Sequence, residues 1–479
     1  MKILLVKAPY QYPHKKALRT ESLGQLYIAA VLRERGFEVS IYDPTMGQPL
    51  KTADGYYYGV PLEKLATIFQ ATRPDVIGLT CHNAYSLSGT ELVARTAKSC
   101  LSKNIMTIAG GVYPSVYKGR ILAECPSIDY AFQGESETAL ADFLGGRSLR
   151  PGELLSVDGL IFRSKNEIKV NDKRHFIHDL DQLPYPARDL VNIRAYMNMK
   201  STLYGLGTKP TLSILTSRSC PNQCRFCNMW LIHGDTWRPR SPQNVIGEFE
   251  LMVKKYSAKH IFVMDDNFTY DPERAKTICE EIIRRRLRFK WNTPHGISVR
   301  KMDFELARLM KKAGCINVCV GIESGSEWVR NELMGKGISN QQITHAVTCF
   351  KKAGLPVCGL MLLGYPGETE DHFKESMAFV SSLPLSLITA SFVFPFPGTR
   401  LYDQLREEGI IAHDFNPPLD DYLEPVFLPP GLQRNRLKQR YQRLLMGFYL
   451  SHIGQIAKEM VLGRAKWITG KGIRRLLGS

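Results

Sequence analysis

Hydrophobic residues along the first 145 positions follow two alternating patterns. Short apolar runs rich in β-branched residues have the length of buried strands, and they cover 2–6, 38–43, 76–80, 106–111 and 129–134. Between them, as at 23–36, apolar residues recur every three or four positions, which is typical of a helix. Strands that alternate with helices predict a parallel, doubly wound sheet, so we expect a Rossmann-like α/β domain at residues 1–145.

A second alternating series begins near residue 206. Its predicted strands cover 211–216, 260–265, 289–293, 316–324, 356–364 and 387–394. Six β/α units predict a partial, open (β/α)6 barrel over 206–410. The segment 146–205 contains a hairpin pattern and a proline-bearing stretch, so we expect a structured linker there. We expect a helical, basic C-terminal region at 411–479.

Composition indicates the cellular compartment in which the chain works. The 479 residues are 44% hydrophobic and include eleven cysteines. No apolar run is long enough to span a bilayer, and the N-terminus does not have the pattern of a signal peptide. We therefore expect a cytoplasmic protein. In a reducing compartment, clustered cysteines indicate metal binding or catalysis more often than disulfides.

The positive charge is concentrated at the C-terminus. The net charge is +17, and residues 432–479 carry eleven Lys and Arg against one acidic residue. Apolar residues at helical spacing from Leu437 to Phe448 favour a helix that covers the barrel. The same pattern, with Trp467, is also compatible with peripheral contact at the inner face of the membrane. No nucleic-acid-binding module is visible, so we expect no specific nucleic acid partner.

Three cysteines lie within eight residues directly after the first strand of the second series. They are Cys220, Cys224 and Cys227 in the stretch SRSCPNQCRFCNMW. A [4Fe–4S] cluster is usually held by four cysteines, so three thiolates on one loop are compatible with such a cluster that has one iron left open. The alternatives are a zinc site with a remote fourth ligand such as His233, or buried free thiols.

This CxxxCxxC pattern, with Phe226 before the last cysteine and six β/α units behind it, resembles the radical S-adenosylmethionine (SAM) superfamily. The resemblance covers residues 205–410. It implies a [4Fe–4S] cluster on the three cysteines, SAM on the open iron, and a 5′-deoxyadenosyl radical formed by one-electron cleavage. An external electron donor such as flavodoxin or ferredoxin is implied as well.

Further motifs match this superfamily in order at the strand ends. FVMDDNF places Asp265 and Asp266 where relatives contact the SAM amino group, and VGIESGS places Glu323 toward the ribose with Ser324 beside it. GLMLLGYPGET matches the segment behind the adenine. The resemblance thus implies cofactor-binding roles for Phe226, Asp265, Asp266, Glu323, Ser324, Gly364 and Glu368. Taken alone, Glu323 is more often a surface or salt-bridged acid.

The first domain resembles the cobalamin (B12)-binding domain that precedes some radical SAM barrels. The matching segments are GGVYPSV, FQGESE and LPYPARDL, and the resemblance implies cobalamin at Gly110, Gly111, Gly134 and Glu135. Taken alone, these glycines also fit a tight turn between a strand and a helix. The chain lacks the DxHxxG motif that supplies a histidine to cobalt, and His82 lies outside any such motif.

The combination predicts cobalamin-dependent radical methyl transfer to an unactivated carbon. A first alternative is a non-methylating oxidative cyclase or rearrangement enzyme of the protoporphyrin monomethyl ester cyclase type. A second is a zinc-bearing protein that binds RNA or a membrane. The expected partner is a small molecule, for which lipid, isoprenoid and tetrapyrrole are the candidate classes. No catalytic residue is assigned beyond the cofactor ligands, and Tyr422, Tyr441 and His452 are guesses for substrate contacts.

Overall fold

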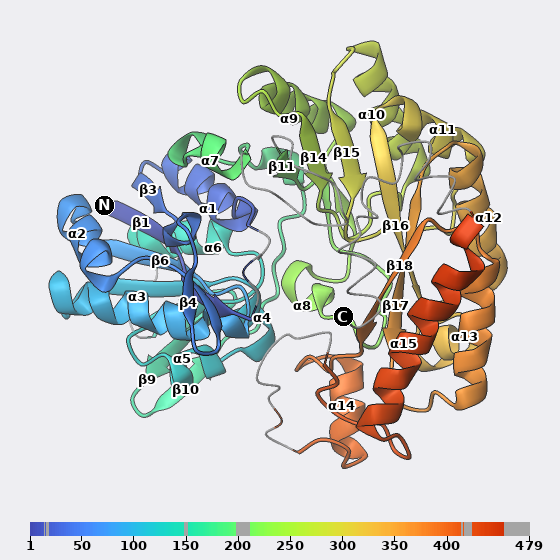
Figure 1. The fold of residues 1–479 in the computed structure, drawn as a ribbon. Helices are drawn as coiled ribbons and strands as arrows, with labels where there is room; N and C mark the ends of the chain where they lie inside the picture. Colours follow the sequence, from blue (N-terminus) through green and yellow to red (C-terminus); the bar gives the residue numbers. More distant parts are fainter. Residues whose placement is uncertain are drawn as a thin grey trace. The chain divides into compact units, whose positions relative to one another are not determined.

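The computed structural model describes residues 1–479 except 14, 16–18, 148–151, 198–210, 413–414, 416–423 and 455–479. The described residues form two compact units (Figure 1). The first comprises residues 1–196 and 228–234, and the second comprises the remainder. Among the described residues, no helix combines the length and apolar character needed to cross a bilayer.

The first unit is built on a seven-stranded sheet in the order β10-β9-β8-β7-β6-β1-β3. Five strands run parallel, as the apolar runs predict: β1 (Lys2–Lys7), β3 (Glu38–Tyr42), β6 (Val76–Thr80), β7 (Met106–Gly110) and β8 (Tyr130–Phe132). The expected hairpin is formed by β9 (Leu160–Ser164) and β10 (Glu167–Val170), and β9 pairs antiparallel to β8. The hairpin therefore extends this sheet.

Helices cover both faces of the first sheet. The helices of the unit are α1 (Leu23–Glu34), α2 (Leu62–Thr72), α3 (Leu87–Cys100), α4 (Val112–Tyr117), α5 (Arg120–Glu124), α6 (Glu137–Asp142), α7 (Ile193–Met197) and α8 (Met229–His233), of which α8 packs on α4. Helix α1 contacts α6, and α2 contacts α3. Leu4 and Val6 join α2 and α3 in one buried core. Because strand residues alternate between faces, Ile3 and Leu5 are buried on the opposite face.

A small antiparallel sheet, absent from the sequence expectation, follows the first strand. It consists of β2 (Tyr10–Tyr12), β4 (Leu50–Thr52) and β5 (Gly55–Tyr58) in the order β2-β5-β4. Tyr10 stacks on Tyr58 with ring centroids 4.8 Å apart. Strands of three or four residues are too short for an alternating pattern to reveal them.

The second unit contains a six-stranded parallel sheet in the order β11-β14-β15-β16-β17-β18. Its strands are β11 (Thr211–Ile214), β14 (His260–Val263), β15 (Lys290–Thr293), β16 (Cys315–Glu323), β17 (Val357–Leu363) and β18 (Leu387–Phe392). The intervening helices are α9 (Pro242–Lys254), α10 (Pro272–Arg284), α11 (Phe304–Lys312), α12 (Asn340–Lys352), α13 (Glu370–Ser382) and α14 (Arg400–Glu407). A short ribbon pairs β12 (Ser217–Arg218) with β13 (Arg238–Pro239). The six predicted β/α units are confirmed.

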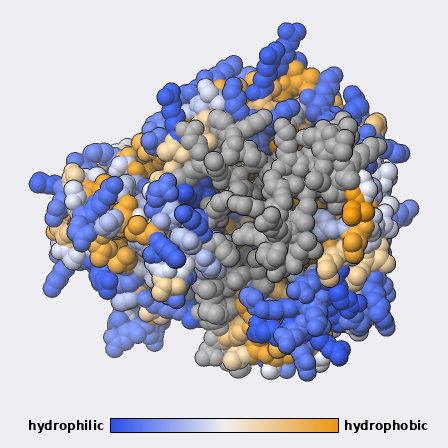
Figure 2. Space-filling model, in the orientation of Figure 1, coloured by the Kyte–Doolittle hydropathy of each residue, from blue (hydrophilic) through white to orange (hydrophobic). Residues whose placement is uncertain are grey.

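Helix α15 (Arg434–Ser451) lies along α13, β17 and β18. Its buried residues include Leu437, Leu444 and Phe448. Its basic residues pair with acids of the same unit: Arg440 and Arg443 contact Glu370, and Lys438 contacts Glu424. Figure 2 shows a predominantly hydrophilic surface over the first turns of this helix. These contacts support the interpretation of residues 434–451 as a packed helix, whereas 455–479, with Trp467, lie outside the described residues.

Truncation of Phe448 is expected to destabilise the second unit. The Phe448 side chain is 1% exposed and stacks on His452. Phe448→Ala removes this buried apolar surface and leaves a cavity, so the free energy of unfolding should fall by about 3–5 kcal/mol. Leu450→Ala is the matched control, because Leu450 is 69% exposed. Urea unfolding should show a lower midpoint for the first variant only. Equal midpoints would contradict the packed position of α15.

Candidate functional site

The three cysteines lie on the loop that follows β11 and β12. Cys224 is buried, and Cys220 and Cys227 are half-buried. The loop is held by backbone hydrogen bonds: the Cys227 N–H donates to the Cys224 carbonyl, and the Arg225 N–H donates to Met334. The Asn267 side-chain amide donates to Cys220 Sγ at 3.6 Å. In the described part of the chain, no three His, Cys, Asp or Glu side chains converge as ligands of a single metal ion.

Asp265 ties the end of β14 to the end of β11. Its carboxylate accepts hydrogen bonds from the Thr216 N–H at 2.6 Å, the Thr216 hydroxyl at 2.5 Å and the Ser217 hydroxyl at 2.6 Å. Burial raises the pKa of Asp265 above its ordinary value, against the opposing effect of Arg274 and these hydrogen bonds. The carboxylate thus has partners within the chain, and its proposed SAM contact stays a prediction. Asp266 is half-buried.

Glu323, at the end of β16, pairs with Lys336, which lies outside the family motifs. Lys336 Nζ donates to Glu323 Oε1 at 2.6 Å, and each side chain is 13% exposed. Glu323 has φ +61°, in the left-handed region that non-glycine residues rarely adopt. Lys336 lies between two glycines with positive φ, Gly335 and Gly337. The backbone strain at Glu323 is of the kind that accumulates at binding and catalytic sites. It marks this strand end as a candidate site.

Lys336 also contributes positive charge to the cysteine loop. Burial lowers its pKa, but the charges of Glu323, Cys224 and Cys220 outweigh this effect and raise it. For the Cys224 thiol, burial has the opposite effect and raises the pKa, and Lys336 opposes that rise. The ammonium of Lys336 is therefore close enough to Cys224 to offset part of the effect of burial on that thiol.

Ser324 and its neighbours fix the loop after β16 against α13. The Ser324 hydroxyl lies 3.0 Å from the Ser376 hydroxyl, and the Ser324 carbonyl accepts from the buried Arg330 side chain. A Cβ at Gly325 would stand 2.5 Å from Ser376 Cα, so only glycine allows this approach. Ser324 thus positions the strand end that carries Glu323.

Gly364 and Glu368 form the turn after β17. Gly364 has φ +78°, and its N–H lies 3.4 Å from Glu368 Oε2. Arg440 of α15 lies 3.7 Å from the same carboxylate. Burial raises the pKa of Glu368 to about 7, while Arg440 and the Gly364 N–H act in the opposite direction and Glu370 raises it slightly. The turn is thereby coupled to the helix that covers it.

The pKa of Glu368 gives the unit a specific pH dependence. A carboxyl whose pKa is raised on folding contributes stability below its ordinary pKa of 4.5 and loses it as pH rises through about 7. The parent should therefore have a higher unfolding midpoint than Glu368→Gln at low pH, and this difference should fall as pH rises from 4.5 to about 7. Glu370 is the control: burial raises its pKa, but hydrogen bonds from Arg443 and Arg440 outweigh burial and lower it below the ordinary value of 4.5. The excess of the parent's midpoint over that of Glu370→Gln should therefore rise with pH only below 4.5 and stay constant between 4.5 and 7. Identical pH profiles for the two variants would refute the assignment.

In the first unit, the predicted glycines lie at the carboxyl end of β7. The Gly110 carbonyl accepts from the Cys81 N–H at 2.8 Å, and a Cβ at Gly110 would meet no atom within 4 Å. Gly111 has φ +110°, and a Cβ there would stand 2.8 Å from the Cys81 carbonyl oxygen. Gly111 is therefore required by the turn itself, while the space beside Gly110 is open to a ligand.

Gly134 and Glu135 follow β8. The Gly134 N–H donates to Ser115 Oγ at 2.8 Å. Glu135 is 5% exposed, and its carboxylate accepts from the Ile177 N–H at 3.1 Å and lies 3.1 Å from His233 Nδ1. His233, the candidate remote zinc ligand, thus pairs with Glu135 in the first unit. The role of both residues toward cobalamin stays a prediction.

The guessed substrate residues have different surroundings. Tyr422 lies outside the described residues. Tyr441 packs on Phe392, with ring centroids 5.7 Å apart. His452 is buried, and its ring nitrogens lie 2.9 Å from the Phe448 carbonyl oxygen and 2.8 Å from the Leu383 carbonyl oxygen. His452 thus serves the packing of α15, and no substrate role is supported for it.

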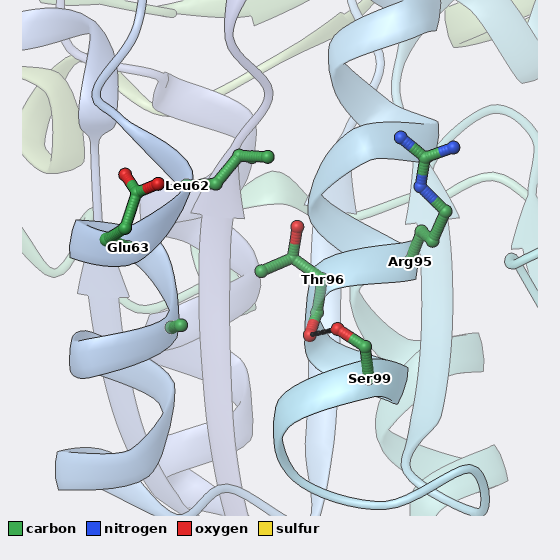
Figure 3. Close-up of a pocket in the computed structure, with 6 residues that line it drawn as sticks. Leu62, Glu63, Arg95, Thr96 and Ser99 are labelled. Atoms are coloured by element: carbon green, nitrogen blue, oxygen red, sulfur yellow. Dashed lines mark hydrogen bonds between the residues drawn. The ribbon is translucent and has the colours of Figure 1, made fainter.

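A surface hollow of about 430 Å³ lies between α2 and α3 of the first unit (Figure 3). Leu62 and Glu63 line it from α2, and Arg95, Thr96 and Ser99 line it from α3. The Thr96 and Ser99 hydroxyls donate to carbonyls of their own helix. It lies on the helical layer, whereas ligands of doubly wound sheets bind at strand ends, so we assign it no catalytic role.

Two family models match the chain. The Radical SAM superfamily matches residues 214–380, and the B12 binding domain matches residues 15–144. The first match contains the cysteine loop, Glu323 and Gly364, and the second contains Gly110, Gly111, Gly134 and Glu135. Together the two models span more than half of the chain.

Comparison with known proteins gives the same result. An uncharacterized methyltransferase of Pyrococcus horikoshii is 27% identical, with 97% of this chain and 98% of the relative covered. The anaerobic magnesium-protoporphyrin IX monomethyl ester cyclase of Cereibacter sphaeroides is 24% identical, with 81% and 63% covered. The radical SAM methyltransferase TsrM from Kitasatospora setae, solved with cobalamin and a [4Fe–4S] cluster, has a TM-score of 0.68 at 18% identity, with 94% and 88% covered. The chain belongs to the B12-binding radical SAM enzyme family, whose cofactors are a [4Fe–4S] cluster, SAM and cobalamin.

Proposed function

We propose that the protein is a cobalamin-dependent radical SAM methyltransferase that acts on an unactivated carbon of a small molecule. The observation that carries this proposal is the three-cysteine loop at the carboxyl end of β11, preceded in the same chain by a B12-type sheet. The methyltransferase named among the relatives, matched over nearly its whole length, favours methylation over other radical reactions.

The residues of the second unit fit an iron–sulfur cluster. Cys220, Cys224 and Cys227 would hold three irons, because their thiols share one loop. Asn267 already donates to Cys220 Sγ, as outer partners of metal ligands do. Phe226 packs against the apolar cluster of Val329, Met334 and Leu401, which shields one side of the loop from water.

When bound, the cluster, SAM and cobalamin supply hydrogen-atom abstraction and a transferable methyl group. The chain's own residues bind, orient and shield. Glu323 would accept hydrogen bonds from the ribose hydroxyls of SAM, and the loop held by Ser324 and Arg330 keeps its backbone in place. Lys336, which pairs with Glu323, is also within electrostatic range of Cys220 and Cys224.

In the first unit, the carboxyl ends of β1, β6 and β7 form the proposed cobalamin edge. Strand order reverses at β1, which has β3 on one side and β6 on the other. Ligands of doubly wound sheets bind at such a switch point. The open space beside Gly110 would allow close approach of the cofactor to the backbone.

The second candidate function is oxidative cyclisation, which the cyclase relative favours. The mass of the product distinguishes the two. The reduced, reconstituted protein is incubated anaerobically with methyl-labelled SAM and a small-molecule extract of its source cells. Methylation gives a labelled product heavier than its precursor by one CH2. A product that has lost hydrogen or gained oxygen, without label, would establish the cyclase function instead. Lipid, isoprenoid and tetrapyrrole fractions of the extract test the proposed substrate classes.

A further inference from the structure

Tyr365 buries a hydroxyl that has no hydrogen-bond partner. The residue follows Gly364 at the carboxyl end of β17, and it is 1% exposed. Its hydroxyl finds no donor or acceptor among the described residues. A buried hydroxyl left unpaired loses its hydrogen bonds to water without replacing them, so native proteins rarely keep one without a reason. A ligand bound nearby would supply the missing partner.

The surroundings of Tyr365 include the cysteine loop. The ring belongs to the apolar cluster against which Phe226 packs, and Phe226 lies between Cys224 and Cys227 in the sequence. Burial raises the pKa of the phenol well above its ordinary value; Arg225 opposes the rise, and Cys224 adds to it. The hydroxyl therefore lies within electrostatic range of Cys224 and keeps its proton at all physiological pH values. It is a donor without an acceptor among the described residues, on a side chain of the apolar cluster against which Phe226 of the cysteine loop packs.

The chain holds this arrangement firmly. The Arg225 N–H donates to the Met334 carbonyl at 2.9 Å, and the Arg225 carbonyl accepts from the Leu401 N–H at 2.9 Å. Met334 and Leu401 belong to the same apolar cluster as Tyr365. The cysteine loop and the phenol are thus fixed to common neighbours. Cys220 has its own donor in Asn267, and Tyr365 would be the corresponding donor at Cys224.

We propose that the Tyr365 hydroxyl donates a hydrogen bond to the sulfur atoms of the cluster at Cys224 and thereby raises the reduction potential of the cluster. This inference rests on the proposed function, because it requires the cluster on Cys220, Cys224 and Cys227. A hydrogen bond to sulfur withdraws negative charge, and the reduced cluster carries one more electron than the oxidised cluster. The bond therefore stabilises the reduced form more strongly.

The test is Tyr365→Phe in the full-length, anaerobically reconstituted protein. Iron and sulfide are counted first, and the cluster is then titrated with a reductant while its visible absorbance and electron paramagnetic resonance signal are followed. We expect Tyr365→Phe to contain as much iron and sulfide as the parent. Its equilibrium constant for cluster reduction should be about three- to tenfold less favourable, which corresponds to the loss of one hydrogen bond. Without the cluster, the variant should unfold at the same denaturant concentration as the parent or a higher one, because it loses only an unpaired hydroxyl.

Tyr402→Phe is the matched control. Tyr402 lies in the same apolar cluster, but its hydroxyl donates to the Phe415 carbonyl at 2.9 Å, so its removal should leave the potential unchanged. A full cluster with an unchanged potential in Tyr365→Phe would overturn the inference. Absence of iron and sulfide from the parent would instead overturn the proposed function. If Tyr365→Phe fails to fold, 3-fluorotyrosine at position 365 keeps the hydroxyl and strengthens it as a donor; an unchanged potential there overturns the inference equally.

Discussion

Replacing Cys220, Cys224 or Cys227 by alanine is expected to abolish formation of 5′-deoxyadenosine. Each substitution removes one of three iron ligands that share a single loop. The described part of that loop contains no fourth cysteine that could replace the lost ligand. A [4Fe–4S] cluster with two protein ligands is not retained. Iron and acid-labile sulfide should fall to background, and turnover of SAM should fall by at least about a thousandfold, since reductive cleavage depends on the cluster.

Cys100→Ala is the control for these three variants. Cys100 is half-buried at the end of α3, and its thiol lies 3.9 Å from a carbonyl of its own helix. This variant should keep both iron and SAM cleavage. Cleavage that survives in Cys224→Ala would refute the cluster assignment. One equivalent of zinc without sulfide in the parent would establish the zinc-site alternative.

Replacing Asp265 by alanine is expected to destabilise the second unit severely. The substitution leaves the Thr216 and Ser217 hydroxyls and the Thr216 N–H without their acceptor inside the protein. It also removes the negative charge that faces the buried Arg274 side chain. Breaking such a buried charged network costs about 3–5 kcal/mol. We expect a large decrease in the midpoint of urea unfolding and loss of soluble protein at 37 °C.

Asp266→Ala separates this structural role from a cofactor role. Asp266 follows Asp265 directly and is half-buried, so its removal should change the unfolding midpoint little. If the SAM contact predicted for this strand end belongs to Asp266, the variant folds normally but binds SAM more weakly. An Asp265→Ala protein as stable as the parent would contradict the hydrogen-bonding role.

The sheets could be predicted from the sequence because their strands are buried on both faces. Continuous apolar runs such as 76–80 mark such strands, and the structure has β6 at the same residues. The small sheet of β2, β4 and β5 could not be predicted. Its strands are short, and β2 pairs with β5 more than forty residues later. Nothing local in the sequence records that pairing.

The candidate site was predictable only in part. The position of the cysteines after a strand fixes them at the carboxyl edge of a parallel sheet, where β/α barrels carry their chemistry. The partners of these residues come from distant segments: Lys336 pairs with Glu323, and Tyr365 belongs to the apolar cluster against which Phe226 of the cysteine loop packs. Lys336 lies between two glycines and Tyr365 follows a glycine, and neither pattern predicts a partner of the cysteine loop or of Glu323. Ser324 and Asp265 match family motifs, yet their side chains have partners within the chain.

The measurement that tests the central claim most directly is one anaerobic assay for 5′-deoxyadenosine and bound cobalamin together. The full-length protein is reconstituted with iron, sulfide and methylcobalamin, washed, reduced with dithionite and supplied with methyl-labelled SAM. We expect both 5′-deoxyadenosine and retained cobalamin. Formation of 5′-deoxyadenosine by a protein that retains no cobalamin would contradict cobalamin-dependent methyl transfer and leave the first unit as a scaffold or substrate domain.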